Sequence, residues 1–368
     1  MKRVGTWLNA GSLATVLSVV LFLQLLHYFF TGLGGPIKLA TRLIPVALAI
    51  HVLNEYRANR LYPRLGVWPN RILAGLYVTV ALVAFVYFER EYENVFLYRA
   101  GDYSTLDVVV GALILLLMME VSRKSHPILF GLNMALVAYS LFGNYIPIDF
   151  LWHPGTTLRR VITASTVELA TGVYGKYSQM ALTLISPFLL VAAVARAFEA
   201  QGALLRAIGA LTGRYRHTIP QSAVLSSLAV GMVSGSGSAN SAVTGTFTIP
   251  LMKQQGIPGA FAAAVETASS MGGLIMPPLM AAAAFMMAEF LGVTYWDVAL
   301  RGFAVGFVYY AAVAAAVYLI SVRSIAPGVV EQPAVPWEDK AKTALFFAAI
   351  ALLTVLLGGF GLGAMRAA

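Results

Sequence analysis

The chain has 368 residues, of which 59% are hydrophobic and only 11% are charged, with a formal net charge of +9 and a mean hydropathy of +0.78. Soluble domains carry about 25% charged residues, so this composition indicates an integral membrane protein. Cysteine is absent, which excludes disulfides, thiolate metal sites and cysteine nucleophiles. The basic residues lie between apolar segments, and no basic patch with interleaved aromatics indicates nucleic-acid binding.

Apolar runs without charged residues predict transmembrane helices along the chain. Lys2 and Arg3 precede the first run, but no small-residue cleavage site follows it, so it predicts a retained helix rather than a signal peptide. The predicted elements, in chain order, are helices at 12–31, 38–54, 71–88, 105–121 and 127–147, an amphipathic segment at 155–171, and helices at 177–197, 297–322 and 343–361.

Lys and Arg predict the orientation, because cytoplasmic loops of membrane proteins are enriched in them. The loop 55–71 carries four arginines, whereas the segment 89–102 is rich in acidic residues. We therefore expect loop 55–71 and the N-terminus to be cytoplasmic and segment 89–102 to lie outside.

The segment 218–252 contains the string GMVSGSGSANSAVTGTFTIPLM and has no charged residue in 35 positions. One crossing needs about 20 residues, and basic residues flank the segment on both sides. These features predict a re-entrant helical hairpin that opens from the cytoplasm, with its tip at Ser234–Ser241. Two alternatives are a flexible linker, which would need two soluble domains to join, and close helix packing at the Gly231–Gly235 pair.

The next segment, 256–291, is also too long for one straight helix and contains the string ETASSMGGLIMPPLM. Paired glycines loosen a helix, and paired prolines remove two backbone donors. We expect two half-helices, 257–270 and 276–291, with an unwound stretch between them. A second pair of glycines, Gly302–Gly306, is more typical of helix packing than of a site.

Irregular backbone at membrane depth is tolerated only where it is buried in protein or lines a cavity. A hairpin tip beside a broken helix therefore predicts a ligand or ion site. The helix beginning near Ala239 would present its N-terminus to an anion, while carbonyls and hydroxyls would suit Na⁺.

Glu266 is the only charged residue between Lys253 and Glu289. Its favoured interpretation is an interfacial carboxylate paired with a cytoplasmic Lys or Arg. The alternative is that it carries a coupling proton or adds negative charge near a cation site.

Residues 234–292, SGSGSANSAVTGTFTIPLMKQQGIPGAFAAAVETASSMGGLIMPPLMAAAAFMMAEFLG, resemble the large-subunit signature of tripartite ATP-independent periplasmic (TRAP) transporters. More closely, they resemble fused permeases that work with TAXI-type binding proteins. By this resemblance the chain divides into a small-subunit-like four-helix region (1–122), large-subunit scaffold and arm helices (123–217), the first half of a transport domain (218–322), a cytoplasmic linker (323–342) and a last helix (343–368) that starts the second half.

The resemblance implies an all-α polytopic protein with about nine to ten transmembrane helices, and one half of an inverted-repeat elevator-type secondary transporter. It would lie in the bacterial inner membrane, where a Na⁺ or H⁺ gradient would drive uptake of an organic anion delivered by a periplasmic TAXI-type binding protein. Neither enzyme activity nor a cofactor other than the coupling ion is expected.

The resemblance also implies which residues bind substrate and ions. The matching positions are Ser234, Gly235, Ser236, Ser238 and Asn240 at the tip, and Ser269, Ser270, Gly272, Gly273, Pro277 and Pro278 in the unwound stretch. The Na⁺ candidates among them are Ser236, Asn240, Ser270 and Gly273. Fused relatives commonly have glutamine where Leu274 stands and glycine near Ala281, which weakens the expected polar contacts with substrate.

The family's large subunit has two hairpins and two broken helices, whereas this sequence has one of each. We therefore expect either a truncated product or a separate partner chain that supplies the second repeat, and no transport by this chain alone. A membrane scaffold subunit without transport activity is the alternative. A channel is less favoured because no filter is visible, and an intramembrane serine protease because His27 and His51 lie in other helices.

Overall fold

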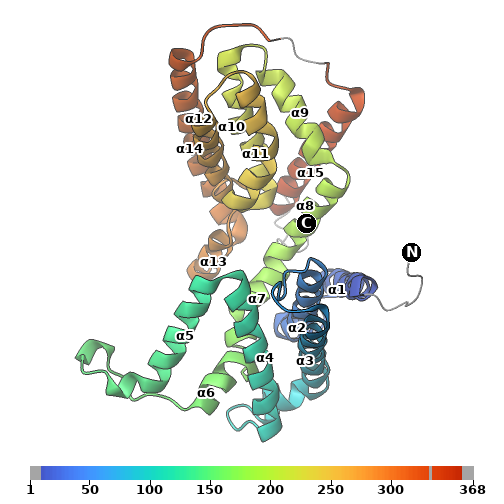
Figure 1. Cartoon of the computed structure of the whole chain (residues 1–368), viewed down its shortest axis with the longest axis vertical. Helices are drawn as coiled ribbons and strands as arrows, with labels where there is room; N and C mark the ends of the chain where they lie inside the picture. Colours follow the sequence, from blue (N-terminus) through green and yellow to red (C-terminus); the bar gives the residue numbers. More distant parts are fainter. Residues whose placement is uncertain (1–9, 331–333, 359–368) are drawn as a thin grey trace. The chain divides into compact units, whose positions relative to one another are not determined.

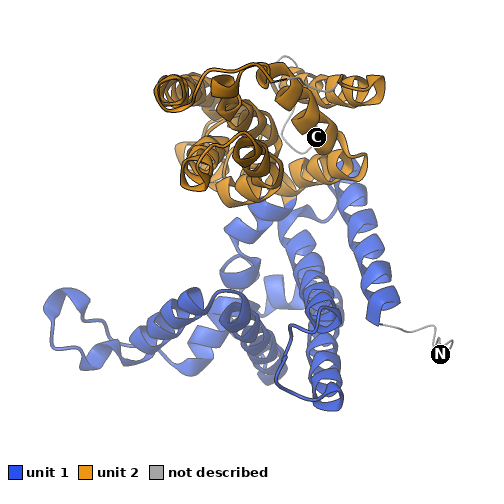
Figure 2. Ribbon diagram, turned by 45° about the horizontal axis from the view of Figure 1, so that its top comes forward, with its two compact units in different colours: residues 1–182 blue, residues 183–368 orange. Residues whose placement is uncertain are grey.

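The computed structural model describes residues 10–330 and 334–358, which form fifteen α-helices with short 3₁₀ and π-helical segments between them (Figure 1). No β-strand occurs among these residues. An isolated antiparallel β-bridge joins Tyr215 and Val329. The chain divides into two compact units, Met1–Leu182 and Thr183–Ala368 (Figure 2).

The first unit is built on long apolar helices. They are α1 (Ala10–Thr31), α2 (Gly35–Arg57), α3 (Val67–Glu93), α4 (Thr105–Ser125), α5 (Pro127–Phe142), and the short α6 (Leu158–Ile162) and α7 (Lys176–Met180). Small residues such as Ala49, Ala81 and Ala84 are almost fully buried between these helices, so their backbones pack closely.

Polar side chains connect the helices of this unit at a few points. Arg42 of α2 pairs with Glu89 of α3. Ser104 and Asp107 form a capping box at the start of α4, and Tyr87 donates to Asp107 Oδ1 at 2.5 Å. The bonds to Asp107 satisfy a fully buried carboxyl group that would otherwise be costly to bury.

The second unit holds the hairpin and the broken helix. Its helices are α8 (Ser186–Ala197), α9 (Ala200–Thr212), α10 (Pro220–Ser234), α11 (Gly237–Gln254), α12 (Gly259–Met271), α13 (Ala282–Leu291), α14 (Tyr295–Ser324) and α15 (Trp337–Gly358). One core cluster joins α9, α10 and α15, and another joins α10, α12 and α14.

Helix α9 was not predicted as a separate element. Leu204, Leu205 and Ile208 bury one of its faces in the core cluster shared with α10 and α15. On another part of α9, Arg206 makes two hydrogen bonds with Asp339 of α15, at 2.6 and 2.7 Å. Helix α9 is amphipathic, contains Arg206 and is only 13 residues long, so it does not form the long uncharged run that indicates a transmembrane helix.

The prediction of an all-α polytopic protein is confirmed. In the described part of the chain, eight helices are long and apolar enough to cross a membrane: Ala10–Thr31, Gly35–Arg57, Val67–Tyr98, Thr105–Ser125, Pro127–Tyr145, Leu158–Ala197, Tyr295–Ser324 and Trp337–Leu357. The broken helix was also predicted to cross the membrane, but its two halves, α12 and α13, are each too short to be included among these eight helices.

The boundary between the compact units lies within the region predicted as large-subunit scaffold and arm, and the five-part division of the chain stays a prediction. The predicted linker 323–342 is shorter in the structure, because α14 ends at Ser324 and α15 begins at Trp337. Residues 331–333 of the linker and 359–368 of the last region lie outside the described residues.

Candidate functional site

The hairpin consists of α10 and α11, which lie side by side and are joined by only two residues (Figure 1). Gly235 adopts a φ of 58°, which reverses the chain after α10 and favours glycine. Ser236 then caps α11, because its hydroxyl accepts from Ala239 N at 3.4 Å. The turn is therefore tighter than the predicted tip, and Ser238 and Asn240 belong to the first turns of α11.

The broken helix begins with α12, which ends at Met271 and is followed by a 3₁₀ turn, Gly272–Leu274. The chain then runs without regular helix until α13 starts at Ala282, six residues later than predicted. Pro277 and Pro278 explain this delay, because proline lacks an N–H group and disfavours helical backbone in the residue before it.

The hairpin and the break pack backbone against backbone. A Cβ atom on Gly231 would lie 2.8 Å from Gly273 Cα, and one on Gly235 would lie 2.8 Å from the Met280 carbonyl. Leu279 N also donates to the carbonyl of Met232 at 3.0 Å. The hairpin therefore meets the broken helix, as predicted. Close packing at Gly231 and Gly235, the alternative interpretation of this pair, also occurs.

Helix α14 packs against the unwound segment through its two glycines. A Cβ atom on Gly302 would lie 2.7 Å from Met280 Sδ, and one on Gly306 would lie 2.8 Å from Met276 Sδ. The packing interpretation of Gly302–Gly306 is thus confirmed. Tyr295 of α14 donates its hydroxyl to the Pro278 carbonyl at 2.6 Å, which satisfies one backbone acceptor that the break leaves free.

Glu266 lies at the centre of the α10–α11–α12 group and is completely buried. Its Oε1 accepts from Ser270 at 2.8 Å, from Ser227 at 3.1 Å and from Thr244, while its Oε2 accepts from Thr248 at 2.5 Å. Among the described residues it has no ion-pair partner. The favoured prediction of an interfacial carboxylate paired with Lys or Arg was wrong, because hydroxyls of three helices enclose this side chain.

Asn240 lies next to this hydroxyl shell and is also fully buried. Its Nδ2 donates to the Ser227 carbonyl at 2.8 Å and to the Ser270 carbonyl at 3.5 Å. Its Oδ1 is buried without a hydrogen-bond partner among the described residues. A buried amide oxygen without a hydrogen-bond donor is a ligand type that a hard cation such as Na⁺ prefers.

Three of the four Na⁺ candidates lie together in the structure. Asn240 Nδ2 contacts the Ser270 carbonyl, and it is also 3.2 Å from the position that a Cβ atom on Gly273 would take. Ser236 is separate, because its hydroxyl contacts Ser238 and Ala239 N at the tip instead. In the described residues, no group of three or more His, Asp or Glu side chains could hold a metal.

The remaining predicted site residues have structural contacts. Ser234 donates to the Ser236 carbonyl at 3.2 Å, and Ser238 is exposed at the tip. Ser269 donates to Val265 O at 2.7 Å. A Cβ atom on Gly272 would come within 2.6 Å of the Tyr310 ring, so this glycine permits close packing against α14.

Four polar residues of the site were missed from the sequence: Ser227, Thr244, Thr248 and Tyr310, whose hydroxyl donates to the Ser227 carbonyl at 3.2 Å. A signal for two of them was present, because Asn240, Thr244 and Thr248 are spaced by four and so share one helix face. Glu266 and Ser270 have the same spacing on α12. Ser227 has no comparable partner on its own helix.

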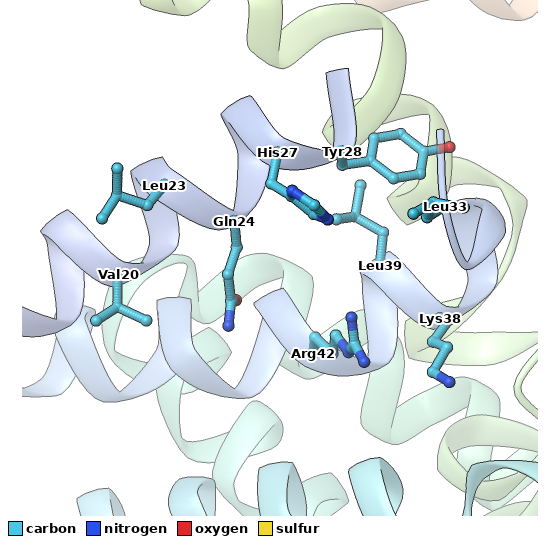
Figure 3. Close-up of a pocket in the computed structure, with 9 residues that line it drawn as sticks. All are labelled: Val20, Leu23, Gln24, His27, Tyr28, Leu33, Lys38, Leu39 and Arg42. Atoms are coloured by element: carbon cyan, nitrogen blue, oxygen red, sulfur yellow. The ribbon is translucent and has the colours of Figure 1, made fainter. Parts of the chain in front are cut away.

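A separate cavity of about 250 Å³ lies in the first unit, between α1 and α2 (Figure 3). Gln24 and His27 of α1 point toward α2, which contributes Lys38 and Arg42. Arg42 already pairs with Glu89, and Lys38 lies 5.2 Å from the centroid of the Tyr92 ring. These basic groups therefore serve contacts within their own unit.

An all-helical polytopic chain in which a helical hairpin meets a broken helix has the construction of a membrane transport protein. The family model of the tripartite ATP-independent periplasmic transporter, DctM component, matches residues 112–368. The chain therefore belongs to this family, which consists of transporter components rather than enzymes and works in the membrane with a periplasmic substrate-binding protein. No curated protein matches the chain. The TAXI type of the binding protein and the fusion of small-subunit and large-subunit regions remain predictions.

Proposed function

We propose that this chain is a permease component of a secondary-active uptake system for an organic carboxylate, driven by a Na⁺ or H⁺ gradient. The observation that supports this proposal is the buried, oxygen-rich group of side chains where the hairpin meets the break, which includes the unpartnered Asn240 Oδ1. The system would lie in the bacterial inner membrane with the chain's N-terminus in the cytoplasm. A TAXI-type periplasmic protein would deliver the substrate.

The cation would be held by Asn240, Ser270 and Gly273, whereas Ser236, which lies at the tip, would contact the substrate instead. The Asn240 amide oxygen is the one side-chain acceptor of this group that lacks a donor in the described residues. Leaving a buried acceptor unsatisfied costs about 1–3 kcal/mol, so a bound cation would stabilise this arrangement.

The substrate carboxylate would approach the start of α11. The first N–H groups of a helix have no intrahelical acceptor, and they carry the positive end of the helix dipole. Ser236 and the exposed Ser238 add two hydroxyl donors at this position. The unwound residues Pro277 and Pro278, close to the tip through the Leu279–Met232 bond, would form the other wall.

A partner chain with the second hairpin and broken helix would complete the site, because transporter sites of this type lie between two inverted repeats. The two repeats would then move together in an elevator-type cycle. The structural alternative is a scaffold subunit that assembles with the transporter and does not itself bind ions or substrate.

The test is uptake into proteoliposomes that contain the chain, its partner chain and the binding protein. Asn240→Leu removes the unpartnered oxygen and should abolish gradient-driven uptake. Thr246→Leu is the matched control, because Thr246 lies on the same helix but is exposed. Equal uptake by wild type and Asn240→Leu would favour the scaffold role and contradict the proposal.

A further inference from the structure

We infer that the first unit binds a phospholipid headgroup that carries both a phosphate and a primary ammonium group, the chemistry of phosphatidylethanolamine. The site is a cavity of about 330 Å³ at one end of α2 and α4, and α3 packs against both of these helices (Figure 1). This volume lies at the lower end of the range of about 300–1,000 Å³ that is typical of ligand pockets. It therefore suits a small charged headgroup rather than a large ligand.

The cavity has a charged side and an apolar side. Its charged lining residues are Glu55 and Arg60, from the end of α2 and the loop after it, and Glu120 and Lys124, from the last turns of α4. The buried side chains of Val52 and Leu61 line the apolar side. Two charges of each sign thus meet at one small cavity.

The end of α2 holds Glu55 and Arg60 close to each other. Asn59 adopts a φ of 54°, which reverses the chain, and asparagine is one of the few residues that tolerate this conformation. Arg60 N then donates to the Glu55 carbonyl at 2.8 Å, and Asn59 N donates to the Tyr56 carbonyl at 3.1 Å. This is the hydrogen-bond pattern of a Schellman motif, so an acid and a base are fixed at neighbouring positions of the cavity.

Glu120 is fully occupied by contacts within the protein. Arg123 donates to its two oxygens at 2.8 and 2.7 Å, and the Tyr62 hydroxyl donates to Oε1. Lys124 is held over the Tyr62 ring, with Nζ at 3.4 Å from the ring centroid. These contacts position the α4 side of the cavity and leave Glu120 with little need of a ligand.

The other charged groups have no such partners. Among the described residues, the side chains of Glu55 and Arg60 make no hydrogen bond or ion pair, and no carboxylate lies within ion-pair distance of Lys124. One acid and two bases are therefore available to a ligand. A phosphate would meet Arg60 and Lys124, and an ammonium group would meet Glu55. A purely anionic headgroup would instead place its charge beside the unpaired Glu55 carboxylate.

The position of the cavity favours a lipid over a soluble ligand. Helices α2 and α4 are each long enough to cross the apolar layer of about 30 Å, so their last turns, with Glu55 and Lys124, lie at the level of the headgroups. Leu113 and Leu116 are exposed and lie on the same face of α4 as Glu120, with spacings of three and four residues. They provide an apolar strip for an acyl chain next to the charged site.

The test compares three dioleoyl phospholipids that differ only in their headgroup. The full-length chain is purified in detergent, and binding of phosphatidylethanolamine, phosphatidylglycerol and phosphatidylcholine is measured by native mass spectrometry. We expect phosphatidylethanolamine to bind about tenfold more tightly than phosphatidylcholine, because a quaternary ammonium group has no N–H to donate to Glu55. Equal binding of the three lipids, or tighter binding of phosphatidylglycerol, would overturn the inference.

The carboxylate of the site is tested by Glu55→Gln. This variant should lose the preference for phosphatidylethanolamine over phosphatidylglycerol, whereas Glu93→Gln, which removes an exposed carboxylate at the end of α3, should keep it. The ratio of the two lipids is read from one spectrum, so partial unfolding of a variant cannot imitate the result. An unchanged ratio in Glu55→Gln would contradict the assignment of the ammonium site.

The phosphate side is tested by Arg60→Gln, which should weaken binding of phosphatidylethanolamine and phosphatidylglycerol by about tenfold each. Arg60→Lys keeps the charge and should restore part of the binding. Arg64→Gln, an exposed arginine of the same loop that does not line the cavity, is the matched control. Equal lipid binding by Arg60→Gln and Arg64→Gln would contradict the phosphate contact.

Soluble O-phosphoethanolamine separates a lipid site from a site for a free small molecule, because it carries the same charged groups without acyl chains. We expect it to bind far more weakly than the lipid, because it cannot use the apolar strip of Leu113 and Leu116. An O-phosphoethanolamine adduct that depends on Glu55, in a chain that does not bind the lipid, would overturn the lipid assignment.

Discussion

The backbone of Gly231 in α10 lies against that of Gly273 in the break after α12, so close that a Cβ atom on Gly231 would be 2.8 Å from Gly273 Cα. This contact joins the hairpin to the unwound segment next to the Asn240 amide, whose Nδ2 is 3.1 Å from the same Cβ position. The candidate cation site thus depends on the absence of two side chains as much as on the presence of polar ones.

Gly231→Ala should therefore separate the hairpin from the break. We expect destabilisation by about 1–3 kcal/mol, because overpacking of a tight contact forces a backbone shift. Thermal unfolding in detergent measures it. Gly75→Ala in α3 is the control, since nothing lies within 4 Å of its Cβ position. A Gly231→Ala protein as stable as the Gly75→Ala protein would show that the contact is looser than described.

Thr248→Val should destabilise the chain at neutral pH by about 1–3 kcal/mol, because it removes a donor from the buried Glu266 carboxyl. Thr246→Val, two residues away and exposed, is the matched control and should change stability little. The measurement is the difference in unfolding temperature between the two variants. Identical temperatures would mean that the Thr248 hydroxyl does not support the carboxyl group.

Tyr295→Phe should loosen the unwound segment. The variant keeps the ring stacking on Phe285, at a centroid distance of 4.1 Å, but loses the 2.6 Å hydrogen bond to the Pro278 carbonyl. We expect a loss of about 1–3 kcal/mol and faster amide exchange at Leu279 and Met280. Tyr318→Phe, at an exposed position, serves as the control. Unchanged amide exchange at Leu279 and Met280 in Tyr295→Phe would contradict the claim that the Tyr295 hydroxyl holds the unwound segment in place.

In the first unit, Tyr62→Phe should also destabilise the chain, by about 1–2 kcal/mol. The Tyr62 hydroxyl donates to Glu120 and contacts the Tyr77 hydroxyl at 2.8 Å. Burial, followed by these two hydrogen bonds, raises the pKa of Tyr62 above its ordinary value of 10.0. The protonated phenol is thus favoured in the folded chain.

The stability that Tyr62 contributes should be fully present below pH 10 and should decline as the pH rises above this value. The difference in unfolding temperature between wild type and Tyr62→Phe should therefore narrow in alkaline buffer. Tyr98→Phe, whose parent side chain is 80% exposed, should match wild type throughout. If the difference in unfolding temperature between wild type and Tyr62→Phe did not change with pH, the role of the Tyr62 hydroxyl as a hydrogen-bond donor would be contradicted.

The sequence was sufficient to locate the hairpin and the break, because glycine, proline and the lack of charge over 218–252 have direct consequences for the backbone. The exact length of the break was not predictable in the same way. Pro277 and Pro278 predict the break itself, but residues 279–281 are apolar enough to begin the next helix. Contacts with Tyr295, Gly302 and Met232 keep them in another conformation.

The environment of Glu266 was predicted incorrectly for a different reason. Its donors come from α10, α11 and α12, and their convergence depends on how three helices rotate about their axes. The spacing of Asn240, Thr244 and Thr248 showed a polar helix face, but it did not show which residue that face would meet. Tertiary packing decided between an interfacial carboxylate and a buried one.

The measurement that tests the central claim most directly is uptake under separately imposed gradients. Proteoliposomes would contain the chain, its partner chain and the binding protein, with the radiolabelled carboxylate that the purified binding protein retains. We predict accumulation above the external concentration when an inward Na⁺ or H⁺ gradient is present, and no accumulation when both gradients are collapsed. Uptake that only equilibrates, or that ignores both gradients, would contradict the account.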